Sequence, residues 1–166
     1  MGSSHPRVVV MGVSGSGKTT VGTMLGEKLG LPYRDGDDLH PQTNIDKMAR
    51  GEALDDDDRW PWLKLVGQWL HQQESGGIIG CSALKRSYRD LIRSAAPGVK
   101  FVHVHGTEEL LSERMNARTG HFMPPSLLKS QLETLEPLGA DEDGLVVDIA
   151  DSPKVIAQKA ADWLTG

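Results

Sequence analysis

The sequence predicts an α/β fold of three layers, in which a five-stranded parallel sheet is flanked by helices and carries a small lid. Apolar, β-branched runs alternate along the chain with stretches of helical spacing, which is the rhythm of βαβ units. The first of these runs leads directly into a glycine-rich loop and then an amphipathic stretch, an order typical of phosphate-binding domains. At 166 residues the chain has the length of one domain.

The elements follow from this rhythm in chain order. A short edge strand is predicted at 32–34, ending at Asp35, and start signals such as Pro153 after Ser152 support several helices. Residues 1–6 are expected to be a disordered N-terminus or a vector-derived remnant, and 7–166 a single kinase domain with a lid at about 114–136. The other strands are predicted at 8–11, 78–81, 99–105 and 145–149, and the helices at 18–29, 41–50, 60–74, 85–94, 107–118, 126–135 and 153–164.

Composition excludes several classes of partner. A net charge of −5 gives no general attraction for nucleic acid or for an anionic membrane, so neither is expected as a partner. No apolar run approaches the ~20 residues that span a bilayer, and the first residues lack a signal-peptide core. The single cysteine, Cys81, excludes an intrachain disulfide and fits a reducing compartment. We therefore expect a cytoplasmic protein.

The glycine-rich loop reads Gly-Val-Ser-Gly-Ser-Gly-Lys-Thr, a complete phosphate-binding motif of the P-loop NTPase fold. Its backbone N–H groups and the following helix N-terminus favour a polyphosphate. Lys18 is expected to reach the β- and γ-phosphates as a catalytic residue, and the Thr19 hydroxyl to bind Mg²⁺. The alternative, a turn with no ligand, fits poorly because strand, loop, Lys-Thr pair and helix agree. The nucleotide-binding residues expected here are Gly12, Ser14, Gly15, Ser16, Gly17, Lys18, Thr19 and Thr20.

Acidic residues follow the edge strand. Asp35, Asp37 and Asp38 crowd one strand end, where like charges raise at least one pKa. Alternation along an extended segment would place Asp35 and Asp37 on the same side. We expect Asp37 to accept the proton of an acceptor hydroxyl, and Asp35 to hold Mg²⁺ through water, because no carboxylate ends the strand at 78–81. Helix capping with solvated carboxylates is the alternative.

Cations gather in a chain whose total charge is negative. An acceptor that carries its own negative charge would explain them, and Lys47 and Arg50, three residues apart, would share a helix face. A solvated helix face is the alternative, and it is favoured for Arg86 and Arg89. The acidic run 55–58 is read as a loop and helix cap rather than a metal site. The cations are Lys47, Arg50, Arg59, Lys85, Arg86 and Arg89.

Residues 114–125 run from a helix into a loop bounded by glycine and proline, as a lid would. Arg114 and Arg118 lie four apart on one face, so that one could contact the nucleotide base or phosphates while the other reaches the γ-phosphate. A pair of arginines that only stabilises the helix C-terminus is the competing interpretation.

Together these segments resemble the gluconate kinase (gluconokinase) family of thermoresistant type, within the shikimate kinase and adenylate kinase group. Thr19 stands where serine is common in that family, which keeps the hydroxyl. The resemblance rests on residues 12–19, 35–41 (Asp-Gly-Asp-Asp-Leu-His-Pro), 44 with 47–48, 58–59 with 61–63, 81–85 (Cys-Ser-Ala-Leu-Lys) with 88–90, 120–123 (Gly-His-Phe-Met), 127–128, 130–131 and 135–136.

The resemblance implies ATP-dependent phosphorylation of D-gluconate at its terminal hydroxyl, with Mg²⁺ required and a homodimer as the expected assembly. It implies that Asp37 is the base or an orienting carboxylate, and that Arg114 and Arg118 contact the nucleotide from the lid, Arg118 in a catalytic role. The substrate-binding set that it implies is Asp37, Lys47, Arg50, Arg59, Lys85 and His121.

Two other functions use the same residues. A kinase of another small hydroxy acid such as shikimate would need the same loop, aspartates and cations. A nucleotide-binding module without catalysis would leave the acidic and cationic acceptor side unexplained. A GTPase is excluded, because the sequence holds no guanine-reading Asn-Lys-x-Asp string.

Overall fold

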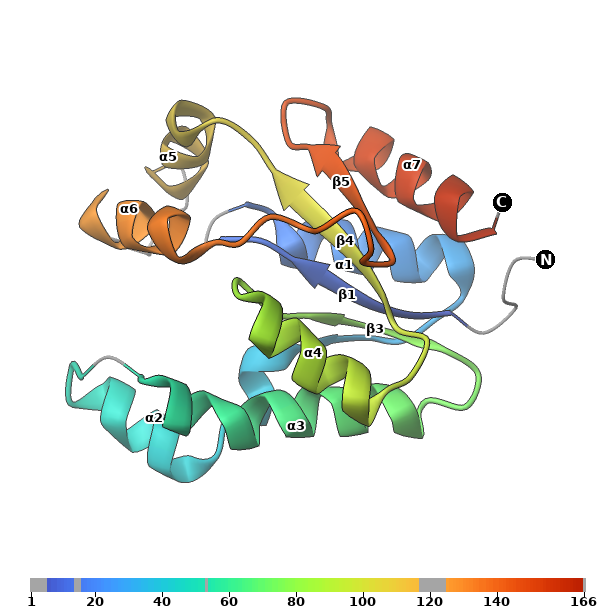
Figure 1. The fold of residues 1–166 in the computed structure, drawn as a ribbon. Coiled ribbons are helices and arrows are strands. Elements are labelled where there is room, and N and C mark those ends of the chain that lie inside the picture. Colours follow the sequence, from blue (N-terminus) through green and yellow to red (C-terminus); the bar gives the residue numbers. More distant parts are fainter. Residues whose placement is uncertain (1–5, 14–15, 53, 117–124, 166) are drawn as a thin grey trace.

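The computed structural model describes residues 6–13, 16–52, 54–116 and 125–165. Within them the strands form one parallel sheet in the order β2-β3-β1-β4-β5 (Figure 1), which confirms the predicted fold class. Val9 of the central strand pairs with Ile79 on one side and Phe101 on the other. The strands are β1 (Arg7–Met11), β2 (Tyr33–Asp35), β3 (Gly77–Gly80), β4 (Lys100–His105) and β5 (Gly144–Asp148).

Helices cover both faces of the sheet. α1 and α7 pack on one face and α3 and α4 on the other, while α5 and α6 lie at the end to which the strands point (Figure 1). The helices are α1 (Lys18–Leu29), α2 (Gln42–Ala49), α3 (Asp56–Gln72), α4 (Arg86–Ala95), α5 (Glu108–Asn116), α6 (Pro125–Thr134) and α7 (Pro153–Thr165), with a short 3₁₀ helix, η1 (Gly36–Leu39), after β2.

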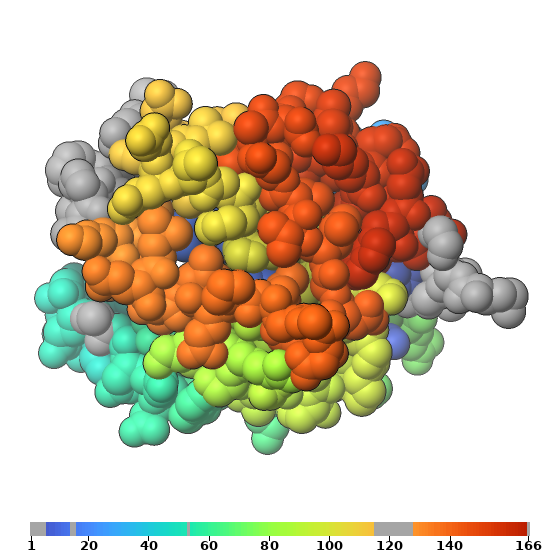
Figure 2. Space-filling view, turned by 45° about the horizontal axis from the view of Figure 1, so that its top comes forward, coloured from blue at the N-terminus to red at the C-terminus, as the bar shows by residue number. Residues whose placement is uncertain are grey.

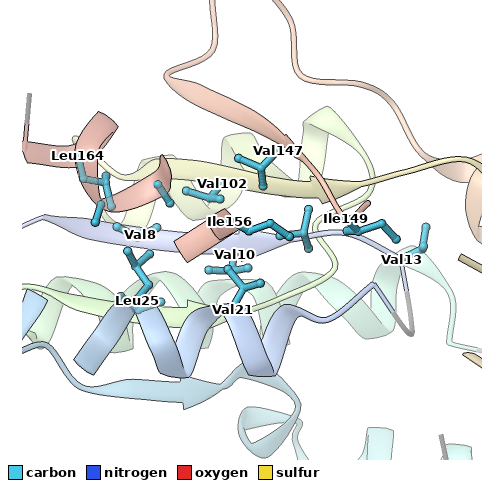
Figure 3. Packing of buried hydrophobic residues seen from close by; sticks show 14 of the residues in the cluster. Val8, Val10, Val13, Val21, Leu25, Val102, Val147, Ile149, Ile156 and Leu164 are labelled. Atoms are coloured by element: carbon cyan, nitrogen blue, oxygen red, sulfur yellow. The ribbon is translucent and has the colours of Figure 1, made fainter. Parts of the chain in front are cut away.

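The side chains of β1 alternate between the two faces of the sheet and so belong to two separate layers of the core. Val8 and Val10 face α1 and α7, where they pack with residues such as Leu25 (Figure 3). Val9 and Met11 face α3 and α4. All of these side chains are fully buried, as expected for a central parallel strand whose two faces are both covered. This burial fixes the end of β1, and with it the start of the phosphate-binding loop.

The segment between α6 and β5 is held against α4. In Figure 2 it appears in orange between α4 and the red C-terminal elements. The Glu136 N–H donates to the Leu84 carbonyl at 2.7 Å, and Arg89 of α4 forms a bidentate pair with Glu142, at 2.8 and 3.1 Å, in which both side chains are buried. The solvated position favoured for Arg89 was therefore wrong, whereas Arg86 pairs with Asp141 at the surface.

Two local predictions were also wrong. α3 begins at Asp56, four residues before the predicted start, because Asp55 and Asp58 form a reciprocal capping box at its N-terminus. The predicted helix cap is therefore confirmed, whereas the rest of the acidic run forms the first turn of α3 rather than a loop. Strand β2 ends at Asp35 and η1 follows at once, so Asp35 and Asp37 do not alternate along an extended segment.

Candidate active site

The phosphate-binding loop joins β1 to α1, and close packing requires its first glycine. Gly12 has a φ of 153°, and an added Cβ would lie 2.6 Å from the Val104 carbonyl and 2.8 Å from Ser16 Oγ. The buried Ser16 hydroxyl in turn donates to the Val13 carbonyl at 2.7 Å, which closes the turn. Ser14 and Gly15, also expected to bind nucleotide, lie outside the described residues.

The start of α1 is arranged for an anion. Gly17 is the N-cap in the left-handed region, and no side chain caps the first turn, which leaves its N–H groups for a ligand. Lys18 Nζ donates to the carbonyls of Gly12 and Val13, each at 3.0 Å, so the ammonium lies over the loop. Thr19 and Thr20 are exposed in the same turn. These placements are those that the binding of a polyphosphate needs.

Asp35 and Asp37 lie together at the end of β2. Asp35 Oδ1 accepts a hydrogen bond from the Asp37 N–H at 2.9 Å and so caps η1. The Asp37 side chain is 78% exposed, yet desolvation by the surrounding protein raises its pKa, and Asp35 raises it further. His40 and Lys18 act in the opposite direction. The effect of Lys18 on this pKa places Asp37 within electrostatic reach of the phosphate-binding loop.

His40 is a member of this site that the sequence analysis did not single out. Its ring stacks on Trp62 at 4.2 Å between centroids, and its Nε2 lies 3.8 Å from Asp37 Oδ1. Trp62 is anchored by donation from Nε1 to the Gly36 carbonyl at 2.8 Å. Burial lowers the pKa of His40, against the effect of Asp37. The spacing of Asp37 and His40 was the available signal, but the stacking partner lies 22 residues further on.

Arg59 and Lys85, predicted to bind the acceptor, meet at one carboxylate. Asp56 accepts from the Tyr88 hydroxyl at 2.5 Å and from Lys85 Nζ at 3.3 Å, and it lies 3.7 Å from Arg59 Nη1. Arg59 also donates to the Tyr88 oxygen at 3.1 Å. We call Asp56, Arg59, Lys85 and Tyr88 the Tyr88 cluster. Sequence reasoning missed Asp56 and Tyr88 here, because their roles depend on contacts between α3 and α4.

The other two cations predicted to bind the acceptor, Lys47 and Arg50, contact different partners. Lys47 Nζ donates to Asp58 at 2.6 Å, in the same first turn of α3 that carries the Tyr88 cluster. Arg50 turns to Glu52 at 2.7 Å on the exposed surface. Although Lys47 and Arg50 are three residues apart, the structure joins only Lys47 to the α3 terminus.

The lid is described only in part. Arg114 donates to the Ile149 carbonyl at 2.8 Å, which ties α5 to the end of β5. Arg118 and His121 lie outside the described residues, so their roles remain predictions.

The residues present fit a hydrated Mg²⁺ ion. In the described part of the chain no three His, Cys, Asp or Glu side chains gather as a metal site. Mg²⁺ usually keeps several waters and takes only one or two protein ligands beside phosphate oxygens. Thr19 offers an exposed hydroxyl, and Asp35 a carboxylate of which one oxygen caps η1.

Comparison with known proteins identifies the family. Residues 14–165 match the family model described as shikimate kinase. The chain is 46% identical over 162 residues to a gluconokinase of Gluconobacter oxydans, covering 96% of this chain and 91% of the relative. The chain therefore belongs to the gluconokinase family.

Further members of this family agree with that assignment. The thermoresistant gluconokinase of Escherichia coli is 46% identical over 153 residues, which cover 90% of this chain and 87% of that protein. The crystal structure of a gluconokinase from Sinorhizobium meliloti superposes with a TM-score of 0.89 at 50% identity, covering 97% of this chain and 92% of that one. The resemblance stated from the sequence motifs is thus confirmed.

Among the described residues, no helix is long and apolar enough to cross a bilayer.

Proposed function

We propose that this protein transfers the γ-phosphoryl group of ATP to the terminal hydroxyl of D-gluconate, giving 6-phospho-D-gluconate. The observation that supports the proposal is that two candidate sites follow the carboxyl ends of neighbouring parallel strands. The phosphate-binding loop follows β1, and the Tyr88 cluster is built from the residues that follow β3 and from the start of α3. Gluconokinase relatives over nearly the whole chain support the choice of acid.

The residues divide the reaction between them. Lys18 and the N–H groups at the start of α1 hold the phosphates, while Asp37 accepts the proton of the attacking hydroxyl. His40, stacked on Trp62, orients Asp37. Thr19 and Asp35 would hold Mg²⁺, which neutralises charge on the β- and γ-phosphates when bound. Arg114 and Arg118 would contribute further positive charge from the lid.

The Tyr88 cluster accounts for an acidic, polyhydroxylated substrate. Arg59 and Lys85 offer positive charge to a carboxylate, and Lys47 of α2 pairs with Asp58 in the same first turn of α3 as Asp56. Asp56, Asp58 and the Tyr88 hydroxyl offer partners to the sugar hydroxyls. Mixed charge of this kind suits a molecule that carries both one carboxylate and many hydroxyl groups.

We also propose a cytoplasmic homodimer. Cys81 is the single cysteine of the chain and is free and buried, so no intrachain disulfide can form, which suits a reducing compartment. The family resemblance supports the dimer.

One assay separates the candidate reactions. ADP release is followed in the presence of ATP and Mg²⁺ with gluconate, with shikimate and with glucose. Gluconate should give the highest kcat/KM by at least tenfold. Faster turnover of shikimate would favour the shikimate kinase activity named by the matching family model. Nucleotide binding without stimulation by any acid would leave a binding module.

A further inference from the structure

Tyr33, at the start of β2, occupies a place that two glycines keep open. A Cβ at Gly22 of α1 would lie 2.2 Å from the Tyr33 ring, and a Cβ at Gly80 would lie 2.3 Å from its hydroxyl oxygen. Neither glycine has a positive φ, so space rather than backbone conformation requires them. The ring therefore lies between α1 and β3, and its hydroxyl reaches the carboxyl end of β3.

The Tyr33 hydroxyl is buried and finds no hydrogen-bond partner among the described residues. Leaving a buried hydroxyl unpaired costs free energy, whereas phenylalanine would fill the same space without that cost. A hydroxyl at this position is therefore expected to meet a group that arrives with a ligand.

The surroundings indicate which ligand that is. Thr19 lies three residues before Gly22 on α1 and so shares its face of the helix. Asp35 lies two residues after Tyr33 on β2 and pairs with Gly80, a strand end that carries no carboxylate. Burial raises the pKa of Tyr33, hydrogen bonding toward the Thr19 hydroxyl lowers it and the Asp35 carboxylate raises it, so both residues lie near the ring, although no partner reaches the Tyr33 hydroxyl with regular hydrogen-bond geometry among the described residues. The hydroxyl thus lies near the two residues expected to hold Mg²⁺.

We propose that the Tyr33 hydroxyl is a positioning group of the magnesium site, which hydrogen-bonds a water molecule of the hydrated ion between Thr19 and Asp35. The Tyr33 hydroxyl of β2 would thus contact the water shell of the ion, a contact for which the end of β3 offers no carboxylate. The inference rests on the Mg²⁺ site of the proposed function. It concerns binding of the metal–nucleotide pair and does not depend on which acid is phosphorylated.

The test compares Tyr33→Phe with Tyr88→Phe, which changes the other tyrosine of the chain. Calorimetry measures ADP affinity with and without Mg²⁺, and thermal unfolding measures the stability of each ligand-free protein. Tyr33→Phe should weaken ADP binding about threefold to tenfold with Mg²⁺, the loss expected for one hydrogen bond, and less than twofold without it. Its ligand-free melting temperature should be unchanged or raised. Tyr88→Phe should leave the affinity for ADP unchanged, both with and without Mg²⁺.

Other outcomes overturn the proposal. Equal losses with and without Mg²⁺, together with a lower melting temperature, would assign Tyr33 a packing role only. If wild-type affinity depends on Mg²⁺ and Tyr33→Phe does not alter that dependence, the inference fails while the proposed function stands. If wild-type affinity is independent of Mg²⁺, the metal site itself fails, and the inference with it.

Discussion

Asp37 combines three properties that a proton acceptor needs. Its carboxylate is open to a substrate, its pKa is raised by desolvation and by Asp35, and His40 lies beside it. A raised pKa makes the ionised form of the carboxylate a stronger base. Asp35 is half-buried and engaged in capping η1, so it is less suited to this task.

Replacing Asp37 should therefore separate chemistry from nucleotide binding. Asp37→Asn should lower kcat by at least about 100-fold, the usual contribution of a general base, with ADP affinity within about twofold of wild type. Because desolvation disfavours the ionised form of Asp37, the variant should not be less stable than wild type. Asp38→Asn, which changes an exposed neighbour, is the matched control for steady-state kinetics and calorimetry. Equal loss of kcat in both variants would contradict the assignment.

The pH dependence of activity should report the same group. As pH falls through the pKa of Asp37, its protonated form can no longer accept a proton, so kcat/KM should fall on the acid side. The midpoint should lie above 3.8, the ordinary value for an aspartate, because the pKa is raised. His40 lowers the pKa of Asp37, so His40→Gln should move this midpoint to higher pH. An unchanged or lower midpoint in His40→Gln would argue against their coupling.

The two arginines of the predicted acceptor-binding set should differ in how strongly their replacement raises KM for gluconate. Arg59 belongs to the Tyr88 cluster, whereas Arg50 pairs with Glu52 at the surface. Arg59→Gln should raise KM for gluconate about 10- to 100-fold, the loss expected for a hydrogen bond to a charged group, with little change in KM for ATP. Arg50→Gln should change either constant less than about threefold. Steady-state kinetics of the two variants decides, and a larger effect at Arg50 would place the acid elsewhere.

At the level of whole elements, α4 is held in place by a buried ion pair. Arg89 is fully buried against Glu142, which comes from the segment before β5, and Arg93 donates to the same carboxylate at 2.8 Å. The pKa of Glu142 is lowered to about 2 because the hydrogen bonds from Arg89, Gly139 and Arg93 outweigh the opposing effect of burial. The pair thus fixes the position of α4, from whose first turn Tyr88 reaches its cluster.

Removing one member of this pair should strongly destabilise the protein. Glu142→Gln leaves the buried Arg89 guanidinium without its counter-charge, so the free energy of unfolding should fall by about 3–5 kcal/mol. Asp141→Asn, at the preceding residue, breaks an exposed pair with Arg86 and should have a much smaller effect. Urea unfolding of both variants measures the difference. Similar losses would show that burial of the Glu142 pair is not what stabilises α4.

The N-terminus of α3 shows why element boundaries were harder to predict than elements. Aspartate is a poor residue inside a helix, so the acidic run was read as a loop and helix cap, of which the cap is confirmed and the loop is wrong. In the first turn the same residues cap free N–H groups and complement the positive end of the helix. The capping of η1 by Asp35 likewise ended the predicted extended segment. Local side-chain hydrogen bonds decided both cases.

For the molecule as a whole, the sheet and the position of the phosphate-binding loop could be predicted because their signals are local. The run before Gly12 reads as a fully buried strand, and the loop motif is contiguous. The acceptor half could be predicted only as a set of charges. Which cation meets which carboxylate depends on contacts such as that between Asp56 and Tyr88, 32 residues apart, and on how α3 packs against α4.

The central claim is that the phosphate-binding loop and the Tyr88 cluster serve one reaction. It is tested most directly by incubating the protein with ATP, Mg²⁺ and D-gluconate, and by identifying the product by proton–phosphorus correlation NMR. We predict one 6-phosphogluconate, with phosphate on the terminal carbon, for each ADP formed, and none with Asp37→Asn. ADP formation without a phosphorylated acid, or phosphate on another hydroxyl, would contradict the account.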